Sequence, residues 1–292
     1  MQIKIIVSST SGINKIEHPE AISSIPDLIK YSDNETYLDE IQISSEIFLS
    51  RLKFDNLEAT ISSPDKSLVD KTLNLYFEQG YDEIIYVLPA AGVLYYDDEL
   101  LDYISSIKNV KVYCSKLIGF PLCFLLMDLL SNITGGLSVD DALALLKKKE
   151  NSVFLAFISP KNEAYNIRQI AYNNEQKHAN RFFELSCSTL IEIKNSENLN
   201  IINKITNNKK NSSKLVDLND FIKYCIKEID NTRIIPFIEY SNENSYYIEY
   251  LEKKLLTIFP ELKKIYKFEI SPSVSNIVGP NAIGVGLIKL TN

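Results

Sequence analysis

The sequence predicts an α/β fold of two domains, an N-terminal α/β domain with a mostly parallel sheet and a C-terminal α+β domain with a largely antiparallel sheet. In the first half of the chain, short apolar runs alternate with amphipathic segments, which is typical of parallel strands joined by helices. In the second half, two apolar runs at residues 190–194 and 199–205 flank four polar residues and predict a hairpin. We place the domains at residues 1–158 and 159–292, with a ligand cleft between them.

Residues 80–92 predict the central strand of the first domain and the loop that follows it. Gly80 ends an amphipathic helix, because glycine accepts the left-handed conformation that closes many helices. Residues 83–88 suit a strand buried on both faces, and Pro89 ends it because proline cannot donate to a ladder. Ligands of parallel sheets bind beyond the carboxyl ends of the strands. We therefore expect Ala90-Ala91-Gly92 at the floor of a binding site, although this loop has no hydroxyl, thiol, imidazole or charge.

A hydroxyl-rich loop, Ser8-Ser9-Thr10-Ser11-Gly12, closes the first predicted strand at residues 3–7. Its hydroxyls and backbone amides could bind a carboxylate or a phosphate. An ordinary turn with helix-capping serines explains this loop equally well.

A second candidate anion site precedes the next helix. Ser63 is the expected N-cap of that helix, and Pro64 its first residue, where the missing N–H costs nothing. Thr60 and Ser62 lie just before it, where free amides and the positive end of the helix favour an anion.

Residues 117–133 are almost wholly apolar and predict a helix. A helix that is apolar all round is enclosed by protein or lines an apolar cavity. Core packing is the commoner outcome, and the cavity matters only if the ligand is a lipid.

The remaining elements follow from caps, turns and periodicity. They are a hairpin at 28–38 that turns at Asp33-Asn34, helices capped by Ser44 and Ser138, helices at 97–107, 218–229 and 246–259, strands at 110–114, 152–158, 233–239 and 265–270, a Gly/Pro-rich loop at 271–284, and a last strand through Lys289.

Composition excludes several classes of function. The net charge of -7 and the pI of about 5.1 disfavour nucleic-acid and anionic-membrane binding, which need a basic surface. The longest apolar run, residues 117–130, contains Pro121 and Asp128 and is too short to span a bilayer, so we expect no integral membrane association. Met1 leads directly into a strand, so no signal peptide is expected. The four widely spaced cysteines indicate structural thiols in a reducing cytoplasm.

Catalysis is the weaker class of hypothesis. No P-loop, G-x-G-x-x-G, HExxH or G-x-S-x-G motif occurs. His18 and His178, the only histidines, lie in polar segments far from any nucleophile motif and are too few for a metal site. We expect no catalytic residue, no metal and no cofactor.

Several loops line up in order with one family. The matching segments are Val7-Ser8-Ser9-Thr10, Ile25-Pro26-Asp27-Leu28, Tyr37-Leu38-Asp39, residues 60–64, residues 80–85, residues 90–96, Cys114-Ser115-Lys116 and residues 271–284. In these segments and their order, over nearly its whole length, the chain resembles the DegV family, bacterial fatty-acid-binding proteins with two α/β domains.

The resemblance implies a cytoplasmic lipid-binding protein that is not an enzyme by itself. It would hold a long-chain fatty acid or a related lipid between its domains, with hydroxyls of the threonine and serine loops on the carboxylate. Some members deliver the acyl chain to a fatty acid kinase, so such a kinase is an implied partner. The implied ligand-binding residues are Ser9, Thr10, Thr60, Ser62, Ala90, Ala91, Gly92, Phe120, Asn276, Ile277 and Gly279.

Departures from the family pattern gather at the head group. Ala90-Ala91 replaces a serine pair, Ile61 a serine and Ile277 a histidine, while Thr206 and Asn208 stand where arginines are usual. Losing two hydrogen bonds to a carboxylate weakens binding by about 3–6 kcal/mol, at most the step from sub-micromolar to millimolar affinity. An interaction protein that kept the fold and changed or lost its ligand is therefore the alternative, and a stand-alone enzyme is the weakest hypothesis.

Overall fold

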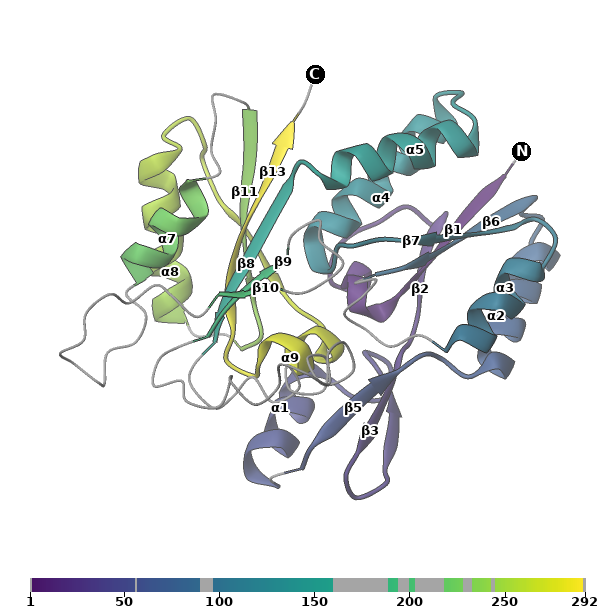
Figure 1. Cartoon of the computed structure of the whole chain (residues 1–292), viewed down its shortest axis with the longest axis horizontal. Coiled ribbons are helices and arrows are strands. Elements are labelled where there is room, and N and C mark those ends of the chain that lie inside the picture. Colours follow the sequence, from purple (N-terminus) through teal and green to yellow (C-terminus); the bar gives the residue numbers. More distant parts are fainter. Residues whose placement is uncertain are drawn as a thin grey trace. The chain divides into compact units, whose positions relative to one another are not determined.

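The computed structural model describes residues 2–55, 57–89, 97–159, 189–193, 200–202, 218–227, 233–242 and 245–290. The chain divides into two compact units, Met1–Asn151 with Ser271–Ser273, and Ser152–Ile270 with Val274–Asn292 (Figure 1).

The first unit is built on a parallel sheet, as predicted. Its strand order is β2-β1-β6-β7, and every neighbouring pair is parallel. The strands are β1 (Ile3–Ser8), β2 (Ile22–Ile25), β6 (Glu83–Leu88) and β7 (Val110–Cys114). Every residue of β1 is buried, since β1 lies inside the sheet and helices cover both faces. Helices α2 (Lys66–Glu78) and α3 (Asp98–Ser106) pack on one face through Val69, Leu73, Leu100 and Ile104.

A smaller antiparallel sheet, of order β4-β3-β5, belongs to the same unit. The predicted hairpin is confirmed as β3 (Leu28–Tyr31) and β4 (Thr36–Leu38), with Asn34 at φ 70° in the turn. Helix α1 (Ser45–Phe54) covers this sheet, and the hydroxyl of Ser44 accepts from the backbone N–H of Ile47 at 3.3 Å, as a cap should.

The start of α2 was predicted wrongly. Helix α2 begins at Lys66 after Asp65, and Thr60 and Ser62 lie inside β5 (Ala59–Ser62). Pairing between β5 and β3 holds residues 59–62 extended, so the chain turns at residues 63–65 before the helix can start. Ser63 instead accepts the backbone N–H of Asp97 at 3.2 Å.

The apolar helix is α4 (Gly119–Thr134), followed by α5 (Val139–Glu150), whose cap Ser138 was predicted correctly. One side of α4 is core, since Leu122 and Leu126 have no exposed surface. Phe120 and Phe124 are only half-buried, and their ring centroids lie 6.3 Å apart. The core interpretation therefore holds for part of the helix surface and leaves a half-buried aromatic stripe.

The second unit contains a six-stranded sheet of order β10-β9-β8-β13-β11-β12. Its strands are β8 (Val153–Ser159), β9 (Thr189–Ile193), β10 (Asn200–Ile202), β11 (Arg233–Tyr240), β12 (Tyr266–Glu269) and β13 (Ile283–Leu290). All neighbours are antiparallel except β11 and β12, which agrees with the predicted largely antiparallel sheet and the predicted β9–β10 hairpin. We predicted the domain boundary after residue 158, whereas the first unit ends at Asn151. The difference is β8, which belongs to the second unit because it pairs with β9 and β13.

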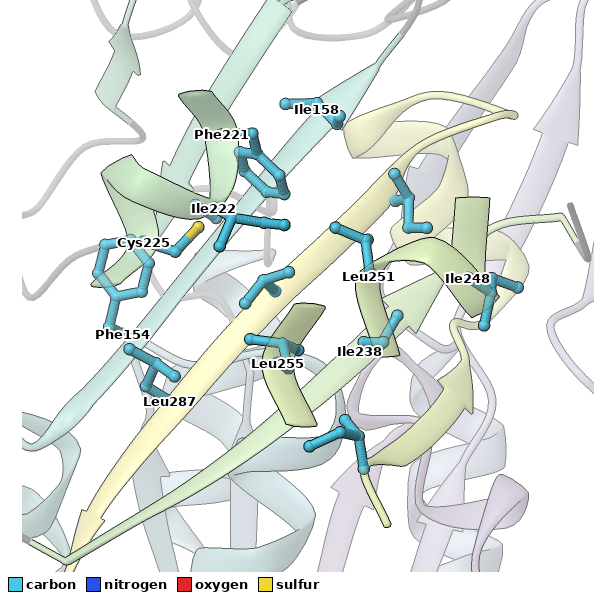
Figure 2. Close-up of a cluster of buried hydrophobic side chains, with 14 of the residues drawn as sticks. Phe154, Ile158, Phe221, Ile222, Cys225, Ile238, Ile248, Leu251, Leu255 and Leu287 are labelled. Carbon is cyan, nitrogen blue, oxygen red and sulfur yellow. The ribbon is translucent and has the colours of Figure 1, made fainter. Parts of the chain in front are cut away.

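Helices α7 (Leu218–Ile226) and α8 (Ser245–Ile258) pack on this sheet. Figure 2 shows Phe221, Ile222 and Cys225 of α7 and Leu251 and Leu255 of α8 in the buried cluster above the strands.

A helix replaces the first part of the loop predicted at residues 271–284. Helix α9 spans Pro272–Val278, with proline at the first position, where its missing N–H is harmless. The three glycines of the C-terminal segment, at 279, 284 and 286, all lie beyond this helix, so neither a glycine nor an internal proline interrupts residues 272–278.

We expect Leu126→Glu to destabilise the first unit by more than about 3 kcal/mol, because truncating a buried leucine alone costs about 2–5 kcal/mol and a buried charge adds to that. Ser131→Glu, at an exposed position of the same helix, should stay within about 0.5 kcal/mol of the parent. Urea denaturation followed by circular dichroism measures both. Equal stability of the two variants would show that α4 is not core at residue 126.

Candidate functional site

Two segments meet at the carboxyl edge of the parallel sheet. Strands β1 and β2 run side by side, with Ser8 paired to Ile25 at their ends. The hydroxyl loop after β1 and Asp27, two residues beyond β2, therefore reach the same edge. Ser9–Ser11 forms a 3-10 turn that closes at Gly12, with φ 69°.

The β3–β4 hairpin places a second carboxyl beside Asp27. Leu28 pairs with Leu38, so the next residues outward, Asp27 and Asp39, face each other across the hairpin. The backbone N–H of Asp39 donates to the carbonyl oxygen of Asp27 at 2.9 Å, which fixes this register.

Hydroxyl groups surround the two carboxyls. Ser8 and Thr10 donate to Oδ2 of Asp27, the latter at 2.5 Å. The Oγ of Ser9 lies 2.8 Å from Oδ2 of Asp39 and 3.3 Å from Oδ2 of Asp27. We call these five residues, with Ser273, the carboxyl–hydroxyl cluster.

Ser273, the second residue of α9, completes the cluster. Its hydroxyl donates to Oδ2 of Asp39 at 2.5 Å. Residues 271–273 belong to the first unit although they lie late in the sequence. The hydrogen bond therefore joins residues 234 positions apart.

Burial dominates the electrostatics of the cluster. It raises the pKa of Asp27, against hydrogen bonds from Ser8, Thr10 and Ser9 that lower it. Burial also raises the pKa of Asp39 to about 8, with a further contribution from the negative charge of Glu40. Carboxyl groups in a dry interior resist ionisation, because water no longer solvates the charge.

Ser9 and Thr10 are buried in the cluster and hydrogen-bond to its aspartates. Both were predicted to bind a ligand, yet both have no exposed surface and both hydroxyls contact carboxyls of the chain itself. The alternative of a capping turn describes part of the loop, since Ser8 accepts the backbone N–H of Thr10 at 3.2 Å. A role for Ser9 and Thr10 in ligand binding stays a prediction.

Sequence reasoning missed Asp27, Asp39 and Ser273. The available signal was the hairpin register, which places residues 27 and 39 opposite each other once the turn is assigned. No local pattern points to Ser273.

The other predicted site residues lie in different places. Thr60 and Ser62 are exposed on β5, and the hydroxyl of Thr60 donates to the carbonyl oxygen of Lys30 at 3.3 Å. Phe120 is half-buried at the start of α4. Ala90, Ala91 and Gly92 lie outside the described residues.

Three predicted residues follow Ser273 in the chain. Asn276 and Ile277 are buried in α9. Gly279, at φ 109°, ends the helix, and its carbonyl oxygen accepts the hydroxyl of Ser241 at 2.6 Å.

Among the residues that the structure describes, no group of three or more His, Cys, Asp or Glu side chains could hold a metal ion. Within the same ranges, no helix has the length and apolar character to cross a membrane.

The whole chain matches solved structures at low sequence identity. DegV from Bacillus subtilis, described as a fatty acid binding protein, matches with a TM-score of 0.77 at 17% identity, covering 99% of this chain and 100% of that one. The chain has the DegV fold. A fatty acid binding DegV family protein from Streptococcus agalactiae gives a TM-score of 0.77 at 14% identity, covering 100% of both chains.

A solved structure that contains a fatty acid also matches this chain. A DegV family protein from Eubacterium eligens, loaded with heptadecanoic acid, gives a TM-score of 0.72 at 15% identity and covers 99% of this chain and 100% of its own. No protein-family model matches the sequence, and no curated protein matches it. The likeness therefore lies in the fold.

We expect Thr10→Val to lower the free energy of unfolding by about 1.5–3 kcal/mol, because the buried carboxyl of Asp27 loses a donor. Thr60→Val is the matched control, since its hydroxyl is exposed and makes one long bond, and it should cost less than about 0.5 kcal/mol. Urea denaturation of both variants checks this. Equal small losses would contradict the buried hydrogen bond of Thr10.

Proposed function

We propose that this chain binds a fatty acid or a related acyl lipid and is not an enzyme by itself. The match of the whole chain to DegV structures carries this proposal. Those proteins are described as fatty acid binding, and two are described with heptadecanoic or stearic acid. The fold was conserved at 14–17% identity to three of these proteins, so the ability to hold a lipid is the simplest shared property.

The apolar part of the ligand would contact the aromatic stripe of α4. Phe120 and Phe124 lie one turn apart and Met127 follows on the next turn, all three half-buried. Covering half-exposed apolar side chains with an acyl chain is favourable by about 25 cal/mol per Å² removed from water. Leu126 faces the core and is not part of this surface.

The polar end of the ligand has fewer donors than the resemblance implied. Ser9 and Thr10 contact Asp27 and Asp39, which leaves Thr60, Ser62 and Asn276 as the side chains proposed for this role. Backbone amides near Gly92 and Gly279 are the other proposed donors. We also propose that Ala90, Ala91 and Ile277 line the head-group region with apolar surface.

A second proposed function is an interaction protein of the same fold with an altered or lost ligand. It is favoured because the hydroxyls of Ser9 and Thr10 contact carboxyls inside the protein.

If the chain binds a lipid, a fatty acid kinase is its proposed partner. A bacterial cytoplasm is the proposed location, in keeping with Cys114, Cys123 and Cys225, which form no disulfide among the described residues.

Mass spectrometry of an organic extract of the denatured native protein tests the proposal first. We expect a stoichiometric fatty acid or acyl lipid. A protein that is empty as purified, and stays empty after incubation with fatty acids, would overturn lipid binding and favour the interaction role.

We expect Phe124→Glu to weaken fatty acid binding about 10- to 100-fold, because the contact of a large apolar side chain is worth about 1.5–3 kcal/mol. Phe54→Glu, at a phenylalanine that is 75% exposed on α1, is the matched control and should leave affinity unchanged. Fluorescent fatty acid displacement measures both. Unchanged affinity in a folded Phe124→Glu variant would remove α4 from the proposed site without refuting lipid binding.

A further inference from the structure

The two carboxyls of the cluster face each other across the β3–β4 hairpin. Asp27 and Asp39 follow directly on the paired residues of the β3–β4 hairpin, where side chains on opposite strands lie about 4.5–5.5 Å apart between Cβ atoms. Both are buried, with exposed fractions of 1% and 0%. Like charges at such a position repel each other.

The groups that face this pair do not supply a positive charge. Glu40 adds a further negative charge beside Asp39, and the phenols of Tyr31 and Tyr86 are the other titratable groups that couple to the pair. No lysine, arginine or histidine of the described residues forms an ion pair with either aspartate. Within the described ranges, no positively charged side chain is placed to neutralise the two carboxylates.

The contacts of Ser9 require one more proton than its hydroxyl supplies. Ser9 has a single hydroxyl proton, yet its Oγ contacts a carboxyl oxygen of each aspartate and also accepts the backbone N–H of Asp27 at 3.0 Å. If Asp39 carries a proton and donates it to Ser9, Ser9 can donate to Asp27, and both contacts are filled. The Oδ1 atoms of Asp27 and Asp39 have no hydrogen-bond partner among the described residues, which is costly for an ionised carboxylate.

We propose that Asp27 and Asp39 share one proton at neutral pH, and that this proton keeps Ser273 latched to Asp39 until rising pH removes it. The inference concerns the cluster alone and stands whether or not the protein binds a lipid.

The latch follows from where water can reach the pair. With the proton in place, a neutral carboxyl tolerates the dry interior. The bond from Ser273 by itself favours the ionised form, but burial outweighs it. Without the proton, two buried carboxylates face each other, and water must enter to solvate them. Ser273, at the start of α9, donates to Asp39 and has no exposed surface, and we assign the opening that admits water to residues 271–273.

The sign of the pH effect is fixed by proton binding. The closed state has a raised pKa at Asp39, about 8, while a hydrated open state has the ordinary value near 3.9. The closed state therefore binds more protons between these values, and the closed-to-open ratio falls up to tenfold per pH unit from about pH 4 to about pH 8. Below this range the preference for the closed state is complete.

Infrared difference spectroscopy between pH 6 and pH 9 tests the proton. We expect the carbonyl-stretch band of a protonated carboxyl group at pH 6, its loss at pH 9, and its disappearance at a lower pH in Asp39→Asn and Asp27→Asn, because each variant removes the second carboxyl that shares the proton. A purely structural role for these residues would give no such band. A band that persists unchanged in both variants, or no band in the parent, would overturn the shared proton.

Hydrogen exchange of α9, corrected for the intrinsic effect of pH, tests the latch. Protection of residues 274–279 should fall from pH 5 to about pH 8 by up to tenfold per unit in the parent protein and then level off. Asp39→Asn, a neutral isostere that keeps the donor and acceptor positions, should keep high protection throughout. A peptide from α5 serves as the internal control and should show no such fall.

Ser273→Ala separates the two parts of the proposal. It should lower the protection of α9 severalfold at pH 5 and leave the infrared band in place. A pH-independent protection in the parent, or protection in Ser273→Ala equal to the parent, would overturn the latch while the infrared result judges the proton.

Discussion

The backbone hydrogen bond from Asp39 to Asp27 fixes the arrangement on which the carboxyl–hydroxyl cluster depends. It continues the register of the β3–β4 hairpin by one pair, so two carboxyls must face each other in the interior. Burial then removes the water that would solvate them, and the hydroxyls of Ser8, Thr10 and Ser273 take its place. The register of this short hairpin therefore decides where hydroxyl donors are needed. Ser8 and Thr10 supply them at the end of β1 and in the loop after it, and Ser273 supplies one from the start of α9.

This constraint limits which hydroxyls are available to a ligand of the kind proposed. Ser9 and Thr10 have no exposed surface, and their hydroxyls contact carboxyls of their own chain. The proposed polar contacts therefore move toward exposed hydroxyls such as Thr60 and Ser62 on β5 and toward backbone amides. The chain has the DegV fold, and the hydroxyls of the loop after β1 contact buried carboxyls of the same chain.

The apolar helix α4 has both fully buried and half-buried side chains. Its composition gives no preferred face, so packing alone chooses which residues become core. Leu122 and Leu126 face the interior, and Phe120 and Phe124 stay half-exposed. Packing therefore leaves a half-buried aromatic stripe on this helix.

The sequence by itself determined the elements whose signals are local. Apolar runs, the turn at Asp33-Asn34 and the caps Ser44 and Ser138 predicted the strands, the hairpin and two helix starts correctly, because caps and turns act within a few residues. Only the tertiary structure decided where distant segments pair. Pairing with β3 moved the start of α2, pairing with β13 put β8 in the second unit, and the bond to Asp39 gave Ser273 its partner 234 residues away. Such partners depend on which strands and helices meet in space, and no local pattern encodes that.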